Sequence, residues 1–129
     1  MVQNLDIYEH ALALLSLELS TEENEDLAER APYHLAAFCA EAEEVDRWLR
    51  STVGADAAES FNSVCIPLEG DFPLSERLAP VAALYLASLL ILDEDPERSD
   101  QLYDRYSEAL SDVYRGIPAT LESIREVYL

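Results

Sequence analysis

The chain has 129 residues, half of them hydrophobic, which is enough for one domain, residues 1–129, with a core of its own. Its 27 acidic residues outnumber eight basic ones, all of them Arg, and give a formal net charge of −19. Because proteins bind nucleic acid backbones and anionic lipids through Lys and Arg, this composition argues against specific nucleic acid binding and membrane binding. It favours protein partners that carry basic or apolar patches.

The first half of the chain is expected to form two helical stretches. Asn4 or Asp6 can cap a first helix that runs to about Leu19. Ser20 or Thr21 can cap the second, and Pro32 predicts a kink or a fresh start near residue 31. The predicted core stripe of this second stretch comprises Leu35, Phe38, Ala42, Val45 and Leu49, at the spacing of a helix packed in a bundle.

Three acid–base pairs in the second stretch are four residues apart, which is the spacing of neighbours on a helix surface. They are Asp26 with Arg30, Glu43 with Arg47, and Asp46 with Arg50. All three are interpreted as surface pairs that support the helix by a few tenths of a kcal/mol each.

Residues 51–73 contain glycines, prolines and scattered apolar side chains, and are expected to form a long irregular loop that packs over the bundle. A short extended piece is predicted around residues 64–66, and Ser75 is a candidate cap for a short turn that leads into the helix that follows. A structureless segment of this length is uncommon in a compact domain unless it packs down or has a function.

Residues 78–92 (LAPVAALYLASLLIL) contain no charged side chain, so no face of this segment is suited to water. A helix of this length measures about 22 Å, which is too short to cross the roughly 30 Å hydrocarbon core of a bilayer. The segment is therefore predicted to be a central helix surrounded by others, with Pro80 in its first turn.

Asp95 followed by Pro96 predicts a strong helix start, and Gly116 followed by Pro118 predicts the end of that helix. Residues 117–129 are too short to bury their apolar side chains alone and are predicted to be a protruding interaction segment. The residues proposed to contact a neighbouring subunit are Tyr114, Ile117, Leu121, Ile124, Val127 and Tyr128. The alternative for these residues is packing on their own bundle.

The sequence offers few candidates for chemistry. Glu22, Glu23, Glu43 and Asp46 could hold Mg²⁺ if two helices brought them together, as in the all-α nucleotide pyrophosphatases. Asp93, Asp95, Glu97 and Asp104 fit part of a calcium-loop pattern, but Arg98 replaces its glycine. Neither His10 nor His34 has metal-site spacing, and Cys39 and Cys65 are interpreted as reduced thiols. The chain is therefore expected to have no catalytic residues, no metal and no cofactor.

The stretch LEGDFPLSERLAPVAALYLASLLILDEDPERSDQLYDRYSEAL, residues 68–110, resembles the head–tail connector (adaptor) proteins of tailed phages and prophages. The shared features are an apolar helix that ends in an acidic turn, a following helix with tyrosines, and a terminal segment like IREVY. The ALALLS and ERAPYHL runs fit the same pattern. The resemblance implies a homo-oligomeric ring, of twelve subunits in the particle, that sits beneath the portal and lines the DNA channel.

The sequence thus predicts an all-α protein, a bundle of four to five helices around a central apolar helix, with the irregular loop at about 51–73. The resemblance implies an assembly protein of the bacterial cytoplasm and then the virion neck, with portal and tail-proximal proteins as partners. The acidic N-terminus is unlike a signal peptide, so the protein is expected not to be secreted. Two alternatives remain open, an Mg²⁺-dependent nucleotide hydrolase and an acidic DNA mimic that binds a basic protein.

Overall fold

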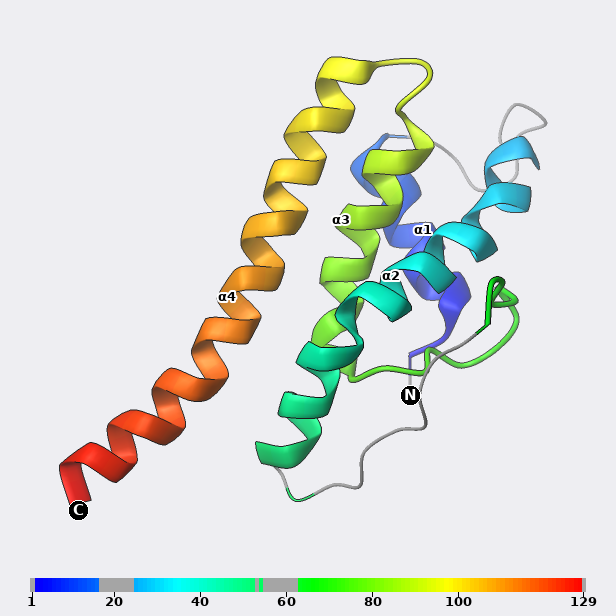
Figure 1. The fold of residues 1–129 in the computed structure, drawn as a ribbon. Coiled ribbons are helices and arrows are strands. Elements are labelled where there is room, and N and C mark those ends of the chain that lie inside the picture. Colours follow the sequence, from blue (N-terminus) through cyan, green and yellow to red (C-terminus); the bar gives the residue numbers. More distant parts are fainter. Residues whose placement is uncertain (1, 17–24, 53, 55–62, 129) are drawn as a thin grey trace.

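The computed structural model describes residues 2–16, 25–52, 54 and 63–128, the last twelve of these for their helical backbone alone. The described residues form four α-helices and one short 3-10 helix (Figure 1). These are α1 (Asn4–Leu14), α2 (Glu25–Thr52), η2 (Glu76–Leu78), α3 (Ala79–Leu90) and α4 (Pro96–Tyr128). The prediction of an all-α bundle is confirmed.

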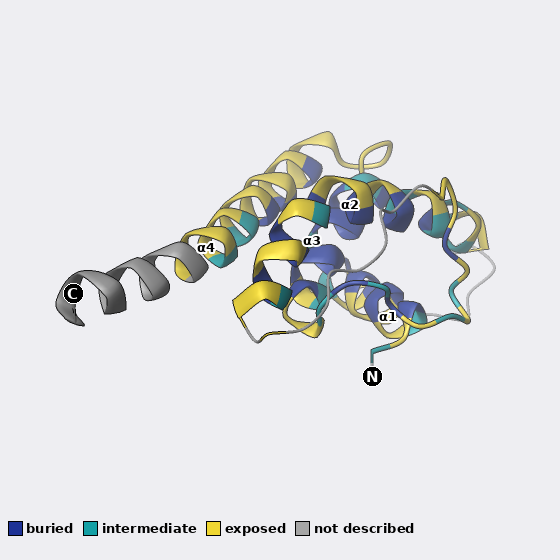
Figure 2. Ribbon diagram, turned by 60° about the horizontal axis from the view of Figure 1, so that its bottom comes forward, coloured by how far each residue is buried: buried dark blue, intermediate teal, exposed yellow. Residues whose placement is uncertain are grey.

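Helix α3 is the centre of the bundle, in contact with α1, α2 and α4 (Figure 1). Ala82, Leu86 and Ala87 are completely buried, and in Figure 2 the helix lies inside the molecule. Pro80 stands in the first turn, where a backbone N–H would have no acceptor within the helix, so the missing N–H of proline removes no helical hydrogen bond. The prediction that the chargeless segment is surrounded by other helices is therefore confirmed.

The buried Ser88 gives α3 a specific contact with α4. Its hydroxyl donates to the carbonyl of Tyr85 at 2.7 Å, and its own carbonyl accepts a hydrogen bond from the Ser99 hydroxyl at 2.7 Å. Both serines are buried, so these bonds replace the water that the two hydroxyls lose on folding. The pairing fixes how the first turns of α4 sit against the end of α3.

The N-cap of α1 lies one residue before Asn4, the earlier of the two predicted caps, and the helix ends sooner than predicted. Gln3 is the residue at the N-cap, and its backbone N–H donates to the Asp6 carboxylate at 3.0 Å. Asn4 is instead buried inside the helix start and donates to the carbonyl of Pro67 at 2.9 Å. The helix ends at Leu14, and Ser16 has a left-handed backbone (φ 59°) that a continuing helix does not allow.

Helix α2 passes through Pro32 without interruption, so the predicted fresh start is wrong (Figure 1). A proline inside a helix removes one backbone hydrogen bond. Here Ala31 and Leu35, on either side of the proline, are completely buried, and their packing offsets that loss. The predicted stripe of this helix is buried throughout. The predicted caps Ser20 and Thr21 lie outside the described residues.

The described part of the loop, residues 63–75, packs on the bundle as predicted. Ile66, Phe72 and Leu74 are buried, and the Ile66 N–H donates to the carbonyl of Pro32 at 3.0 Å. The expected extended piece at residues 64–66 forms no strand, and Val64 is 79% exposed. The described residues do form an isolated β-bridge, which is antiparallel and joins Gln3 to Asp71.

Helix α4 begins as predicted, since the Asp95 carboxylate accepts a hydrogen bond from the Arg98 N–H at 3.1 Å. The predicted end at Gly116 and Pro118 is wrong, because α4 continues to Tyr128. A helix-ending glycine adopts a left-handed backbone, and Gly116 does not. Without that conformation the glycine lowers helix stability by about 1 kcal/mol but does not end the helix.

Candidate protein-interaction surface

An open groove lies between the C-terminal half of α2 and the middle of α4, with a volume of about 490 Å³. We call it the α2–α4 groove; its lining residues are Val45, Leu110, Ser111, Tyr114 and Arg115. Val45 and Leu110 belong to the core-facing stripes of their helices and form the apolar part of the lining. Tyr114 is 40% exposed, so an aromatic ring stands at the edge of the groove in contact with water.

A second hollow, of about 300 Å³, lies along the same part of α2. It is lined by Glu44, Arg47, Trp48 and Ser51. Trp48 follows Val45 by three residues, so the two side chains are neighbours on the helix surface. Its indole is 42% exposed. Exposed Trp and Tyr beside an apolar groove are typical of protein interfaces.

Tyr114 is the predicted contact residue whose side chain the structure describes, and it lines the α2–α4 groove. The other predicted contact residues lie in residues 117–128, where the structure describes the backbone alone. Because α4 is one helix, Leu110 shares a face with Ile117, Leu121 and Ile124, three of the predicted contact residues. The predicted contact residues thus continue the face of α4 that packs on the core.

Sequence reasoning did not identify Trp48 or the groove-lining role of Val45 and Leu110. One signal was present, because Trp48 is the single tryptophan of the chain and falls outside the apolar stripe of α2. An indole on the polar side of an amphipathic helix is a candidate for a contact with another molecule. The groove itself depends on where α4 crosses α2, which no residue pattern specifies.

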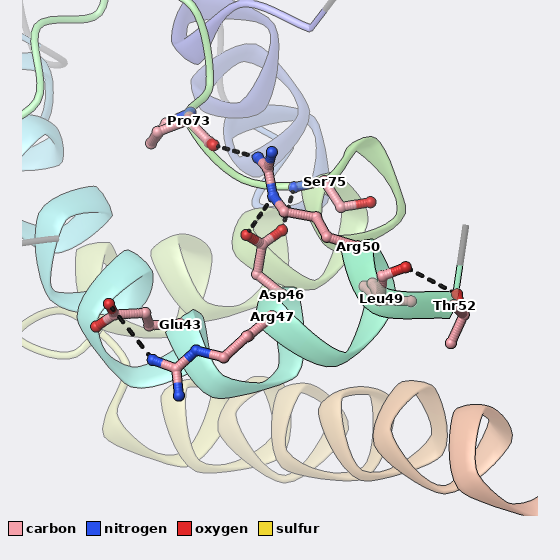
Figure 3. A network of polar contacts seen from close by, with 8 residues as sticks. All are labelled: Glu43, Asp46, Arg47, Leu49, Arg50, Thr52, Pro73 and Ser75. Atoms are coloured by element: carbon pink, nitrogen blue, oxygen red, sulfur yellow. Dashed lines mark hydrogen bonds and ion pairs between the residues drawn. The ribbon is translucent and has the colours of Figure 1, made fainter. Parts of the chain in front are cut away.

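The C-terminal half of α2 is held in place by a polar network that joins it to the loop before η2 (Figure 3). The Arg50 guanidinium donates to the Asp46 carboxylate at 2.8 Å and to the carbonyl of Pro73 at 3.0 Å. The second oxygen of Asp46 accepts the Ser75 N–H at 2.7 Å. Ser75 therefore contributes its backbone, and its side chain makes no capping bond.

The Asp46–Arg50 pair is not the surface pair that its spacing predicted. Asp46 is 2% exposed, and the carboxylate has a partner on each oxygen. The loop segment around residues 73–75 covers it, and the sequence spacing gave no indication of that cover. Asp26 with Arg30, at 3.5 Å, and Glu43 with Arg47, at 3.9 Å, do lie at the surface.

The proposed magnesium site loses one of its four carboxylates to this network, because both Asp46 oxygens already accept hydrogen bonds. Glu43 pairs with Arg47, while Glu22 and Glu23 lie outside the described residues. Within the described part of the chain no three His, Cys, Asp or Glu side chains cluster closely enough to hold a metal ion.

The acidic turn that resembles a calcium loop has other roles in the structure. Asp95 caps α4, and the Asp93 carboxylate lies 3.7 Å from the Arg30 guanidinium. This second contact ties the turn between α3 and α4 to the start of α2.

Burial, with the nearby Arg30 charge, lowers the pKa of His34, so this histidine is neutral at pH 7.

Aromatic side chains from three helices and the loop meet in the core next to the α2–α4 groove. Phe38 of α2 contacts Phe72, Tyr85 and Tyr106, with ring centroids 6.4, 5.7 and 6.1 Å away. Tyr85 and Tyr106 pack edge to face at 4.9 Å. Burial raises the pKa of Tyr106, and the nearby Glu41 charge adds to this effect. The cluster fixes α4 against α2 and α3.

The two cysteines differ strongly in environment, and we expect them to differ in reactivity. Burial, with the Asp46 charge adding to it, raises the pKa of Cys39 to about 12, whereas Cys65 is exposed. Since the thiolate is the reactive form and almost none of Cys39 is thiolate at pH 8, Cys39 should react far more slowly than the exposed Cys65. Thiol titration of the native protein should show one fast group per chain, and two in denaturant. Two fast groups in the native protein would contradict the burial of Cys39.

No family model, curated protein sequence or solved structure matches this chain. In the described residues, no helix combines the length and the apolar character that a membrane span requires.

Proposed function

We propose that the protein is a structural subunit that functions by assembling with other proteins. The observation that carries this proposal is the α2–α4 groove, where the exposed ring of Tyr114 stands beside Val45 and the half-buried Leu110. Large exposed aromatic side chains have a solvation cost in a monomer, and contact with a partner removes it. The described residues that line the groove are apolar or aromatic apart from Ser111 and Arg115, and none of them is a carboxylate.

Within this class, we propose a head–tail connector of a tailed phage or prophage. The sequence resemblance of residues 68–110 supports the proposal, and those residues form the central helix and the first half of α4. In this role the subunits form a ring beneath the portal and contact portal and tail-proximal proteins. The ring assembles in the bacterial cytoplasm and remains in the virion neck.

The acidic surface is compatible with a wall of the DNA channel. A wall that lacks Lys and carries a net charge of −19 per subunit repels phosphates, so DNA passes without binding. The same charge opposes assembly of free subunits at low salt, where screening is weak. Assembly is therefore proposed to be favoured by high ionic strength or by a portal that serves as a template.

The nucleotide hydrolase alternative is less well supported, because Asp46 is committed to Arg50 and Ser75. That engagement removes one of the four carboxylates on which the alternative depended. The alternative of an acidic DNA mimic is supported by the net negative charge alone.

A chain truncated after Gly116 tests the proposal. The described α4 residues that pack on the core are Ser99, Leu102, Tyr106, Ala109, Leu110 and Val113, all before this point. We therefore expect the truncated chain to keep the helices of its remaining residues and most of its thermal stability, and to lose self-assembly and portal binding. Circular dichroism measures helical content and thermal stability, and sedimentation velocity at about 1 M salt, with and without portal, measures assembly and portal binding; the full chain is the control.

Loss of the fold on truncation would instead show that residues 117–129 pack on their own bundle. A full chain that stays monomeric at high salt and does not bind portal would contradict the connector proposal.

A further inference from the structure

We propose that the α2–α4 groove of one copy binds the C-terminal helical segment, residues 117–128, of a second copy. This inference rests on the proposed function, which requires self-assembly, and it names the two surfaces that meet. The groove is the acceptor and the segment is the donor.

The acceptor has the chemistry that an amphipathic helix requires. Val45 and Leu110 supply an apolar lining, and Trp48 and Tyr114 expose about two fifths of their surface beside it. The groove and the hollow beside Trp48 follow α2 over nearly two turns, from Glu44 to Ser51. A helix docks in such a groove with apolar side chains at positions i, i+4 and i+7.

The donor has apolar residues at this spacing. Ile117, Leu121, Ile124 and Tyr128 follow one another by four, three and four residues along one face of α4. Helix α4 has 33 residues and α3 has 12, so their lengths are about 50 Å and about 18 Å. The central helix is therefore too short to cover this face of α4 to its end.

Charge also favours this pairing. The donor, residues 117–128, contains two Glu and one Arg and has a formal charge of −1, whereas the whole chain has −19. The donor is thus the weakly charged end of a strongly acidic chain. Arg47 and Arg115, two of its eight basic residues, line the groove and the hollow beside it, with 61% and 70% of their side chains exposed. Two copies meet with the least repulsion when this weakly charged segment enters this site.

The donor cannot come from the same copy. Leu110 and Tyr114 of α4 form one wall of the groove, and residues 117–128 continue that helix without a break. A helix cannot turn back into a groove that it lines unless its backbone hydrogen bonds break. The contact is therefore between two copies, and repetition of such a donor-to-acceptor contact produces a ring if the rotation closes.

Two full-length variants separate donor from acceptor. The first, Leu121→Asp with Ile124→Asp, removes the donor stripe and keeps the groove with its single tryptophan. The second, Trp48→Arg, blocks the acceptor, keeps the donor stripe and has no tryptophan of its own. Each variant alone should be monomeric at about 1 M salt, where the Debye length falls to about 3 Å and the wild-type chain assembles.

The mixture should form a one-to-one complex, because one intact donor meets one intact acceptor. Titration of the Trp48→Arg variant into the donor variant should shift the fluorescence of Trp48 to shorter wavelength as its indole becomes buried. Sedimentation velocity should show the complex in the same samples. Tyr33→Arg, at a 58% exposed position in the first half of α2, is the matched control and should assemble like the wild type.

The inference is wrong if the wild type assembles and either variant alone assembles equally well, or if the mixture leaves the Trp48 emission unchanged. Those results would leave the proposed connector function intact, with a different subunit contact. A wild-type chain that remains monomeric under all conditions and does not bind portal would overturn both.

Discussion

Replacement of Asp46 by alanine is expected to destabilise the protein by about 3 kcal/mol, the lower end of the range for breaking a buried ion pair. The substitution removes the acceptor of Arg50 and of the Ser75 N–H, which both meet the Asp46 carboxylate where it is buried. Arg50 keeps its bond to Pro73 and is 28% exposed, which limits the loss. Urea denaturation with linear extrapolation measures the change in the free energy of unfolding.

Asp112→Ala is the matched control, because Asp112 pairs with Arg115 at 2.8 Å while both side chains are more than half exposed. This exposed pair should contribute less than about 1 kcal/mol. A double-mutant cycle of Asp46→Ala with Arg50→Ala should show a destabilisation smaller than the sum of the single ones. Equal effects of Asp46→Ala and Asp112→Ala would contradict the buried network.

Replacement of Leu86 by alanine is expected to destabilise the protein by about 2–5 kcal/mol. Leu86 is completely buried in α3, which α1, α2 and α4 surround, so the lost methyl groups leave a cavity that the helices cannot close without moving. For a chain of this length the melting temperature should fall by roughly 8–20 °C. Thermal unfolding followed by circular dichroism measures this shift.

The corresponding control is Leu92→Ala, two residues beyond α3, where the side chain is 44% exposed. This substitution should change the free energy of unfolding by no more than about 0.5 kcal/mol. If Leu86→Ala proved equally mild, the central position of α3 would be in doubt.

The aromatic cluster and the Asp46–Arg50 network explain how a subunit with so much negative charge keeps a defined groove. The aromatic cluster around Phe38 holds α4 against α2, and the Asp46–Arg50 network holds the end of α2 against the loop. Both contacts involve residues next to the groove lining, since Asp46 follows Val45 in α2 and Leu110 follows Tyr106 by about one turn of α4. A groove with fixed walls loses little conformational entropy when it binds a partner.

Of the interaction surface, sequence reasoning predicted Tyr114 and the apolar stripe that follows it, because both have the periodicity of a helix face. It did not predict Trp48. It also did not predict that Val45 and Leu110 converge, because these two residues are 65 positions apart in the chain and meet only where α4 crosses α2. The acid–base pairs had the same limitation. Their spacing of four residues was correct, but it could not indicate that the loop would bury Asp46.

The sequence alone determined the helical class of the fold, the central position of α3 and the start of α4. In these places the signal is local and strong: a run without charge has to be buried, and an Asp–Pro pair satisfies the first turn of a helix. Only the tertiary structure decided that α2 passes Pro32 and that α4 passes Gly116 and Pro118. Helix breakers impose a cost of about 1–3 kcal/mol each, and whether a helix ends there depends on the rest of the folded chain. For α2 the packing on both sides of Pro32 exceeds that cost, and no local pattern contains this balance.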